Sequence, residues 1–78
     1  MVQIDDARSF GAALRAARRA AGLSQQDLAD RARVARRTVA SVEGGHPNGE
    51  VSTFLALVRA LGLQVRLVPG ADAAHTQH

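Results

Sequence analysis

A cluster of arginine and hydroxyl side chains lies where two short helical patterns meet in the middle of the chain. Arg36, Arg37 and Thr38 follow a break in the pattern, and Ser41 comes one helical turn later. The planar guanidinium group of arginine can donate two hydrogen bonds to O6 and N7 of guanine. Gln25 starts the preceding helical pattern, where its amide would meet a phosphate at the positive end of the helix dipole. These residue types and positions indicate contact with nucleic acid.

Two helices separated by a three-residue break must position this cluster. Ser24 and Asp27 have the spacing of a capping box, which begins the first helix. The break at residues 33–35 precedes a second helix, expected from Arg36 to Glu43. The inward positions of the two helices are Leu28, Ala29, Ala32, Val39 and Val42. The arginine cluster is then left on the outward face, which is the arrangement of a helix-turn-helix whose second helix enters the major groove of DNA.

Two further helices are expected on either side of this pair. The first runs from about Ala7 to Ala21, with Asp5 and Asp6 as capping residues. Its apolar face consists of Phe10, Leu14, Ala17 and Ala21. The last helix runs from about residue 51 to residue 61. Its apolar stripe consists of Val51, Phe54, Leu55, Val58 and Leu61.

Residues 63–68 alternate between apolar and polar side chains, which is the pattern of a β-strand. Leu63, Val65 and Leu67 share one side of it. A lone strand in an otherwise helical chain has backbone groups that still need hydrogen bonds. Pairing with the same strand of a second copy across a two-fold axis would satisfy them and form a homodimer. Packing of this segment along its own helices remains the alternative.

These elements predict an all-α fold of four to five helices with a short C-terminal β-strand for dimerisation. The chain has 78 residues, of which 46% are hydrophobic, and this is enough for one compact domain. We assign residues 1–68 to that domain and expect residues 69–78, which lack apolar periodicity, to be a disordered tail. The net charge is +3 and all ten basic residues are arginine, a balance that permits nucleic-acid binding without establishing it.

Catalytic and metal-binding constellations are missing from the sequence. The chain has no cysteine, and His75 and His78 lie in the tail without the further ligands that a metal set needs. His46 lies in a loop, where solvent exposure and a phosphate contact are both open. We therefore expect no enzymatic activity, no cofactor and no metal. The polar, acidic N-terminus and the lack of a long apolar run predict a cytoplasmic protein without a membrane segment.

The motif residues resemble those of the Cro/phage-repressor (XRE) helix-turn-helix family. The resemblance covers about residues 10–61 and implies a lambda-repressor-like bundle. It is carried by Arg18, Gly22-Leu23-Ser24-Gln25, Leu28-Ala29, Arg36-Arg37-Thr38-Val39 and Val42-Glu43-Gly44-Gly45. It also implies roles for individual residues: Arg18 pairs with Glu43, Gln25 contacts a phosphate, and Arg36, Arg37 and Ser41 read bases.

Three positions depart from the family pattern. Arg33 stands where the tight turn usually has glycine, and Gly44 stands where asparagine is usual. Ala35 stands where serine or threonine usually caps the recognition helix, and the loss of such a cap costs about 1 kcal/mol. The departures at Arg33 and Ala35 would loosen the turn. None of the three departures removes a proposed base-reading residue.

With its terminal strand, the chain is similar to HipB-like antitoxins in particular. That resemblance implies a repressor of its own operon that binds a palindromic double-stranded operator and a HipA-type serine/threonine kinase toxin. Two alternatives stay open: a stand-alone phage or host regulator without a toxin partner, and a protein-interaction adaptor that has lost DNA binding. A plain helical bundle with solvated arginines is the simplest competing interpretation.

Overall fold

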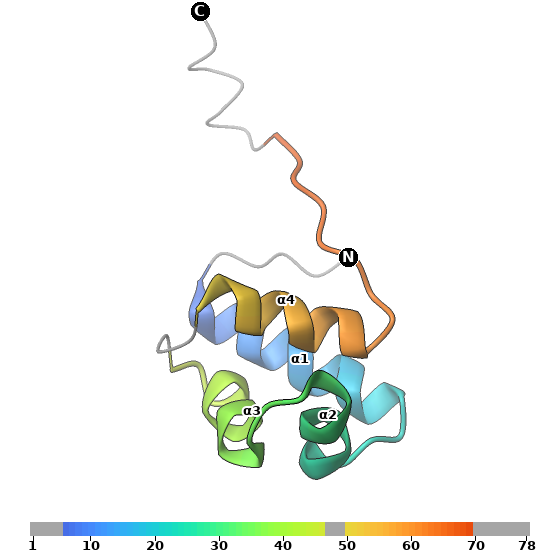
Figure 1. Ribbon diagram of the computed structural model, residues 1–78. Helices are drawn as coiled ribbons and strands as arrows, with labels where there is room; N and C mark the ends of the chain where they lie inside the picture. Colours follow the sequence, from blue (N-terminus) through green and yellow to red (C-terminus); the bar gives the residue numbers. More distant parts are fainter. Residues whose placement is uncertain (1–5, 47–49, 70–78) are drawn as a thin grey trace, which may run out of the picture.

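The computed structural model describes residues 6–46 and 50–69, and these ranges contain four helices (Figure 1). They are α1 (Ala7–Ala20), α2 (Gln25–Ala32), α3 (Arg36–Glu43) and α4 (Val51–Ala60). Helix α3 packs against α1 and α2, and α2 also packs against α4. The predicted all-α fold is confirmed, and the helix-turn-helix pair α2–α3 lies together on one side of the bundle.

Local signals in the sequence explain where the first two helices begin. The Ser9 N–H donates to Asp6 Oδ1 at 2.8 Å, and the Asp6 N–H donates to Ser9 Oγ at 3.1 Å. At α2, the Asp27 N–H donates to Ser24 Oγ at 3.0 Å and the Ser24 N–H donates to Asp27 Oδ2 at 2.9 Å. These reciprocal bonds satisfy backbone donors that a helix start otherwise leaves unpaired. The same bonds from backbone N–H groups lower the pKa of both aspartates.

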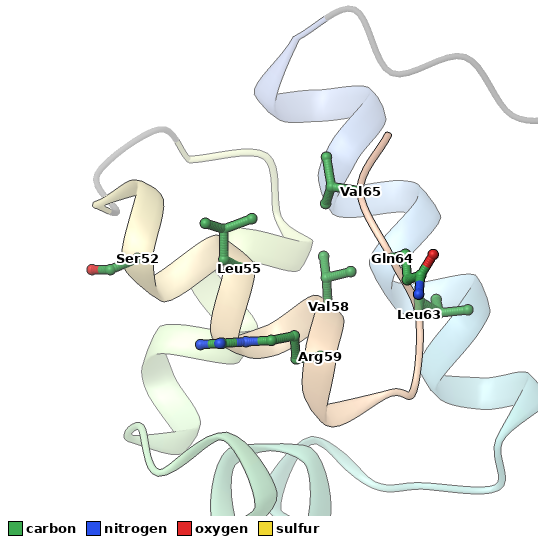
Figure 2. A pocket seen from close by; sticks show the side chains of 7 residues that line it. All are labelled: Ser52, Leu55, Val58, Arg59, Leu63, Gln64 and Val65. Atoms are coloured by element: carbon green, nitrogen blue, oxygen red, sulfur yellow. The ribbon is translucent and has the colours of Figure 1, made fainter. Parts of the chain in front are cut away.

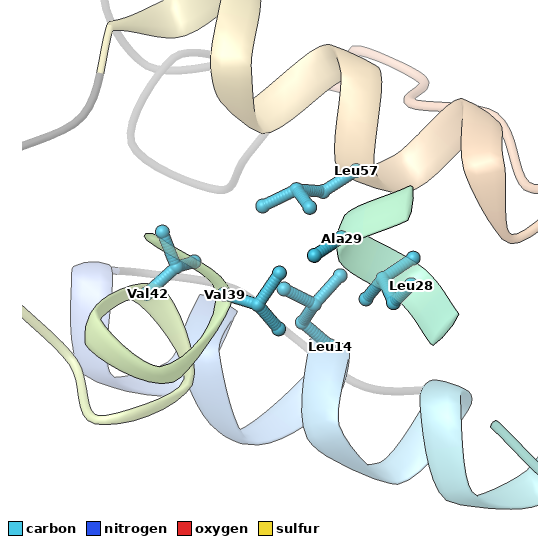
Figure 3. Packing of buried hydrophobic residues seen from close by; sticks show 6 residues of the cluster. All are labelled: Leu14, Leu28, Ala29, Val39, Val42 and Leu57. Atoms are coloured by element: carbon cyan, nitrogen blue, oxygen red, sulfur yellow. The ribbon is translucent and has the colours of Figure 1, made fainter. Parts of the chain in front are cut away.

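The hydrophobic core draws at least one side chain from every helix (Figure 3). Its buried members are Leu14, Leu28, Ala29, Val39, Val42 and Leu57. Leu28, Val39 and Leu57 are completely inaccessible to solvent. Phe10 of α1 and Phe54 of α4 are also in contact, and the centroids of their rings are 5.1 Å apart. The core therefore fixes the two helices of the motif against the two that flank them.

The predicted apolar stripe of α4 is confirmed for Phe54, Val58 and Leu61 and was wrong for Val51 and Leu55. Val51 and Leu55 are 70% and 40% exposed, whereas Leu57, which the stripe omitted, is fully buried. The inward face thus adds Leu57 to the predicted Phe54 and Val58, which lie one helical turn apart. In α1, Ala21 is likewise exposed, because it is the C-cap residue and not part of the buried face.

The predicted C-terminal strand is absent from the described residues of the single chain. Residues 63–69 form neither helix nor sheet, and they leave the end of α4 as an extended segment (Figure 1). A β-ladder needs a second strand, and the helical bundle provides none. Leu67 is 97% exposed, so the alternative in which this whole segment packs along its own helices is not seen either. Apart from Pro69, the tail predicted at 69–78 lies outside the described residues, together with His75 and His78.

Arg33, in the turn between α2 and α3, has a left-handed backbone conformation. Its φ and ψ angles are 59° and 45°, and no other non-glycine residue in the two described ranges has a positive φ. Side chains with a Cβ disfavour this conformation, whereas glycine adopts it without steric cost. The turn therefore stores backbone strain at the position where the family pattern has glycine.

Arg33→Gly is expected to stabilise the domain by about 0.5–1 kcal/mol, because relief of strain exceeds the added freedom of the unfolded chain. The matched control is Arg31→Gly, which removes the same charge from a right-handed helical position and should destabilise by about 0.5–1 kcal/mol. Urea unfolding followed by circular dichroism measures both changes. A less stable Arg33→Gly variant would contradict the assignment of strain.

Candidate nucleic-acid interface

The N-terminal end of α3 presents two arginines to solvent. Arg36 and Arg37 are exposed in the first turn, and Thr38 and Ser41 are half-buried at its sides. Burial of Val39 and Val42 against the core fixes this rotation of the helix. Arg36, Arg37 and Thr38 therefore lie at the N-terminal end of α3, and Ser41 lies one helical turn further along. No side chain caps this helix, because its N-cap residue is Ala35.

A buried ion pair holds the other end of α3. Arg18 Nε donates to Glu43 Oε2 at 2.6 Å and Arg18 Nη2 donates to Glu43 Oε1 at 3.0 Å, which makes the contact bidentate. The side chains of Arg18 and Glu43 are only 9% and 3% exposed. Arg18 Nη1 also donates to the Leu23 carbonyl at 2.8 Å, next to the start of α2. One guanidinium group on α1 thus links the end of α3 to the loop before α2.

Both members of this pair are charged at neutral pH. Burial alone would raise the pKa of the Glu43 carboxyl, but hydrogen bonds from Arg18 and Gln25 outweigh burial and lower it. The hydrogen bond to Glu43 raises the pKa of the Arg18 guanidinium. A bidentate, charge-assisted contact of this kind is strong and directional. The ion pair therefore holds the C-terminal end of α3 against α1.

Gln25 connects the buried pair to the exposed arginine. Its Nε2 group donates to Glu43 Oε1 at 3.3 Å, and its Oε1 accepts from Arg36 Nη1 at 3.2 Å. The carboxylate of Glu43 sets which way the amide of Gln25 points, because a carboxylate can only accept hydrogen bonds. The oxygen of Gln25 then faces Arg36. Four predicted site residues, Arg18, Glu43, Gln25 and Arg36, thus form one hydrogen-bonded chain.

The contact between Gln25 and Arg36 was not anticipated from the sequence, which assigned Gln25 only to a phosphate. The two residues are 11 positions apart on different helices, so no local pattern could have shown it. The amide of Gln25 has two N–H groups, and the bond to Glu43 occupies one of them. A phosphate contact through the second N–H is therefore compatible with the observed network.

Gly11 is a structural residue near this site that the sequence interpretation missed. It is buried in α1, and a Cβ atom placed on it would lie 2.2 Å from Val42 O and 2.9 Å from Glu43 O. Both of these atoms belong to the backbone at the end of α3. A glycine inside a helical pattern usually has a packing reason, and that signal could have found it. The absence of a side chain at Gly11 permits the close approach of α1 and α3.

Residues 63, 65 and 67, predicted for dimerisation, lie apart from this interface and are exposed. Between residues 6 and 46 and between residues 50 and 69, no three histidine, cysteine or acidic side chains come together as metal ligands would. Over the same two stretches, none of the helices has the length and apolar character needed to cross a membrane.

Comparison with known proteins identifies one family. A family model described as a helix-turn-helix domain matches residues 9–69, which is most of the chain. The matched region extends from the first turn of α1 through the segment that follows α4. None of the curated proteins compared with the chain matches its sequence.

Proposed function

Because the chain belongs to the helix-turn-helix domain family, we propose that it is a DNA-binding transcriptional regulator and not an enzyme. The observation that carries this proposal is the exposed N-terminal end of α3, where Arg36 and Arg37 stand free of the core. In helix-turn-helix proteins the N-terminal residues of the second helix contact base edges in the major groove. Arginine is the side chain best suited to recognise guanine there.

Each residue of the interface has a distinct part in this proposal. Arg36, oriented by Gln25, and Arg37 read base edges, while Thr38 and Ser41 line the sides of α3 that face the groove. Gln25, at the first position of α2, uses its remaining N–H on a phosphate near the positive end of that helix. Arg18 and Glu43 do not touch DNA; they hold the helix that does.

The narrower proposal is a homodimeric repressor of its own operon that acts as a HipB-like antitoxin. The alternating residues Leu63, Val65 and Leu67 support the dimer, because they are exposed and apolar. Two recognition helices related by a two-fold axis would read palindromic half-sites about 34 Å apart. A HipA-type kinase toxin as partner rests on the resemblance alone. A stand-alone regulator is the alternative, and a toxin gene next to this one in the genome would decide against it.

Arg36→Ala and Arg37→Ala are each expected to weaken binding to a selected operator by about 5- to 150-fold, the loss of one good base contact. The operator is the duplex that the full chain enriches most from a randomised library. Fluorescence anisotropy at fixed salt measures affinity, and circular dichroism verifies the fold. Arg19→Ala, at an exposed position of α1, is the matched loss of one charge. Unchanged affinity in both α3 variants would reject the interface.

Gln25→Ala separates orientation of Arg36 from contact with a phosphate. If Gln25 orients Arg36, the variant should lose discrimination between operator and random DNA, and this loss should vanish in an Arg36→Ala background. A role confined to the phosphate would weaken binding to both DNAs equally and add to the effect of Arg36→Ala. The network observed here predicts the first result, and full additivity would contradict it.

A further inference from the structure

A groove of mixed apolar and polar lining lies between α4 and the extended segment that follows it (Figure 2). It has a volume of about 420 Å³. Its apolar lining comes from Leu55 and Val58 of α4 and from Leu63 and Val65 of the segment, and its polar lining includes Arg59 and Gln64. Two more large apolar side chains of the segment, Leu67 and Val68, are 97% and 76% exposed. Exposed apolar residues gathered around a groove are typical of an interaction surface.

Beyond Leu63, the backbone of the described part of the segment has no hydrogen-bond partner within the chain. The Leu63 N–H donates to Val58 O at 3.2 Å, and in the described part of the chain no further backbone hydrogen bond involves residues 64–69. An extended stretch with unpaired N–H and C=O groups is a template for pairing with another strand. The segment therefore offers unpaired backbone groups to another strand and exposed apolar side chains to a partner surface.

We propose that residues 63–67 of two copies of this chain pair antiparallel about a two-fold axis at Val65, so that each Leu67 covers the groove of the other copy. The inference rests on the proposed homodimer, and it adds which residues of the two copies pair and where Leu67 packs. In an antiparallel pair, residues directly opposite each other point to the same face. Leu63, Val65 and Leu67 therefore stay on one face of the pair only if the two-fold axis passes through a residue and not between two residues. Within the segment, the axis can then pass through Gln64, Val65 or Arg66.

Charge and length select among these three registers. An axis at Arg66 would place the two guanidinium groups opposite each other, and like charges in this position destabilise a sheet. An axis at Gln64 would place Leu67 opposite Leu61, which is the C-cap residue of α4 and not part of the extended segment. An axis at Val65 pairs Leu63 with Leu67 and Gln64 with Arg66. This register pairs residues 63–67 within the segment and opposes no like charges.

The same register explains the exposure of Leu67 in the single chain. Leu63 lines the groove, so a Leu67 opposite it from the second copy would lie over the groove as well. A two-stranded ribbon is only marginally stable alone and needs an apolar surface to pack against. Leu55 of α4, which lines the same groove and is 40% exposed, is part of that surface. Backbone pairing and groove coverage are thus met by one arrangement.

Cross-linking through single cysteines tests the register, because the native chain contains no cysteine. In the proposed register, Val65→Cys places two thiols opposite each other within disulfide distance, so oxidised glutathione should convert most of the protein to a covalent dimer. Gln64→Cys and Arg66→Cys alone should cross-link poorly, but a mixture of the two should form a heterodimer. Poor cross-linking of the Val65→Cys variant, or stronger cross-linking of either other variant by itself, would overturn the register.

Leu67→Ser tests the seat in the groove. It should raise the dissociation constant of the dimer at least tenfold in analytical ultracentrifugation, while Arg66→Ala, on the opposite face of the segment, should change it little. Equal effects of both variants, or a native chain that stays monomeric, would overturn the proposal. Anisotropy with the selected operator keeps the two proposals distinct. DNA binding by a chain that fails to cross-link overturns the register alone, and cross-linking without DNA binding overturns the proposed function alone.

Discussion

Replacing Glu43 by alanine is expected to destabilise the domain by about 3–5 kcal/mol, because the change leaves the buried Arg18 without its counter-charge. A domain of this size has a stability of only about 5–15 kcal/mol, so much of the margin would be lost. Gln25 would lose its hydrogen-bond acceptor in the same variant. Glu50→Ala, at an exposed carboxylate, is the control and should change stability little.

Urea unfolding of Arg18→Ala, of Glu43→Ala and of the variant that carries both changes measures the coupling energy between the two side chains. Acid provides a second readout. Because the folded pKa of Glu43 lies below its ordinary value of 4.5, its ionisation stabilises the fold above that pH. This contribution is lost as the pH falls from about 4.5 through the folded pKa. Glu43→Gln should therefore lose less stability than the native chain over that pH range. Zero coupling energy would contradict the role of the pair.

Gly11→Ala is expected to destabilise the domain by about 3 kcal/mol, because backbone atoms of α3 occupy the space that the new methyl group needs. The experiment tests whether the substitution lowers or raises the free energy of unfolding. At an unobstructed helix position the same substitution stabilises by about 1 kcal/mol through helix propensity. Val42 O cannot move without displacing the end of α3. The loss should therefore exceed any gain in propensity.

Thermal and urea unfolding provide the measurement for Gly11→Ala. The matched control is Ala16→Gly, at an exposed position of the same helix, which should cost only about 1 kcal/mol. A Gly11→Ala variant as stable as the native chain would show that the approach of α1 to α3 is looser than the structure has it.

Local features of the fold could be read from the sequence. The capping boxes at Asp6 and Ser24 consist of residues three positions apart, so their signals are complete within one turn. The rotation of α4 could not be read in this way. Most of its residues are apolar and they lie on several faces, so periodicity alone did not distinguish Leu55 from Leu57. Only packing against α2 selects the buried one.

The candidate site was predictable residue by residue but not as a network. Spacing placed Arg36 and Arg37 outward on α3, and the family resemblance suggested that Arg18 pairs with Glu43. The bridge that Gln25 forms between Glu43 and Arg36 depends on how α2 and α3 cross. A crossing geometry is a tertiary property that no local pattern encodes. The strand predicted at residues 63–68 has a related limit, because alternation of side chains does not supply a pairing strand, and none lies beside this segment in the described part of the chain.

The two ends of α3 are held very differently, and this bears on how the helix opens. Near Val42 and Glu43 it is fixed by the contact with Gly11 and by the bidentate bond from Arg18. At Ala35 its first turn has no side-chain cap. Amide hydrogens in the last turn should therefore exchange with solvent only when the whole domain unfolds, whereas those of the first turn should exchange through local fraying. The C-terminal end of α3 is thus fixed to α1, whereas its first turn can adjust to the surface that it contacts.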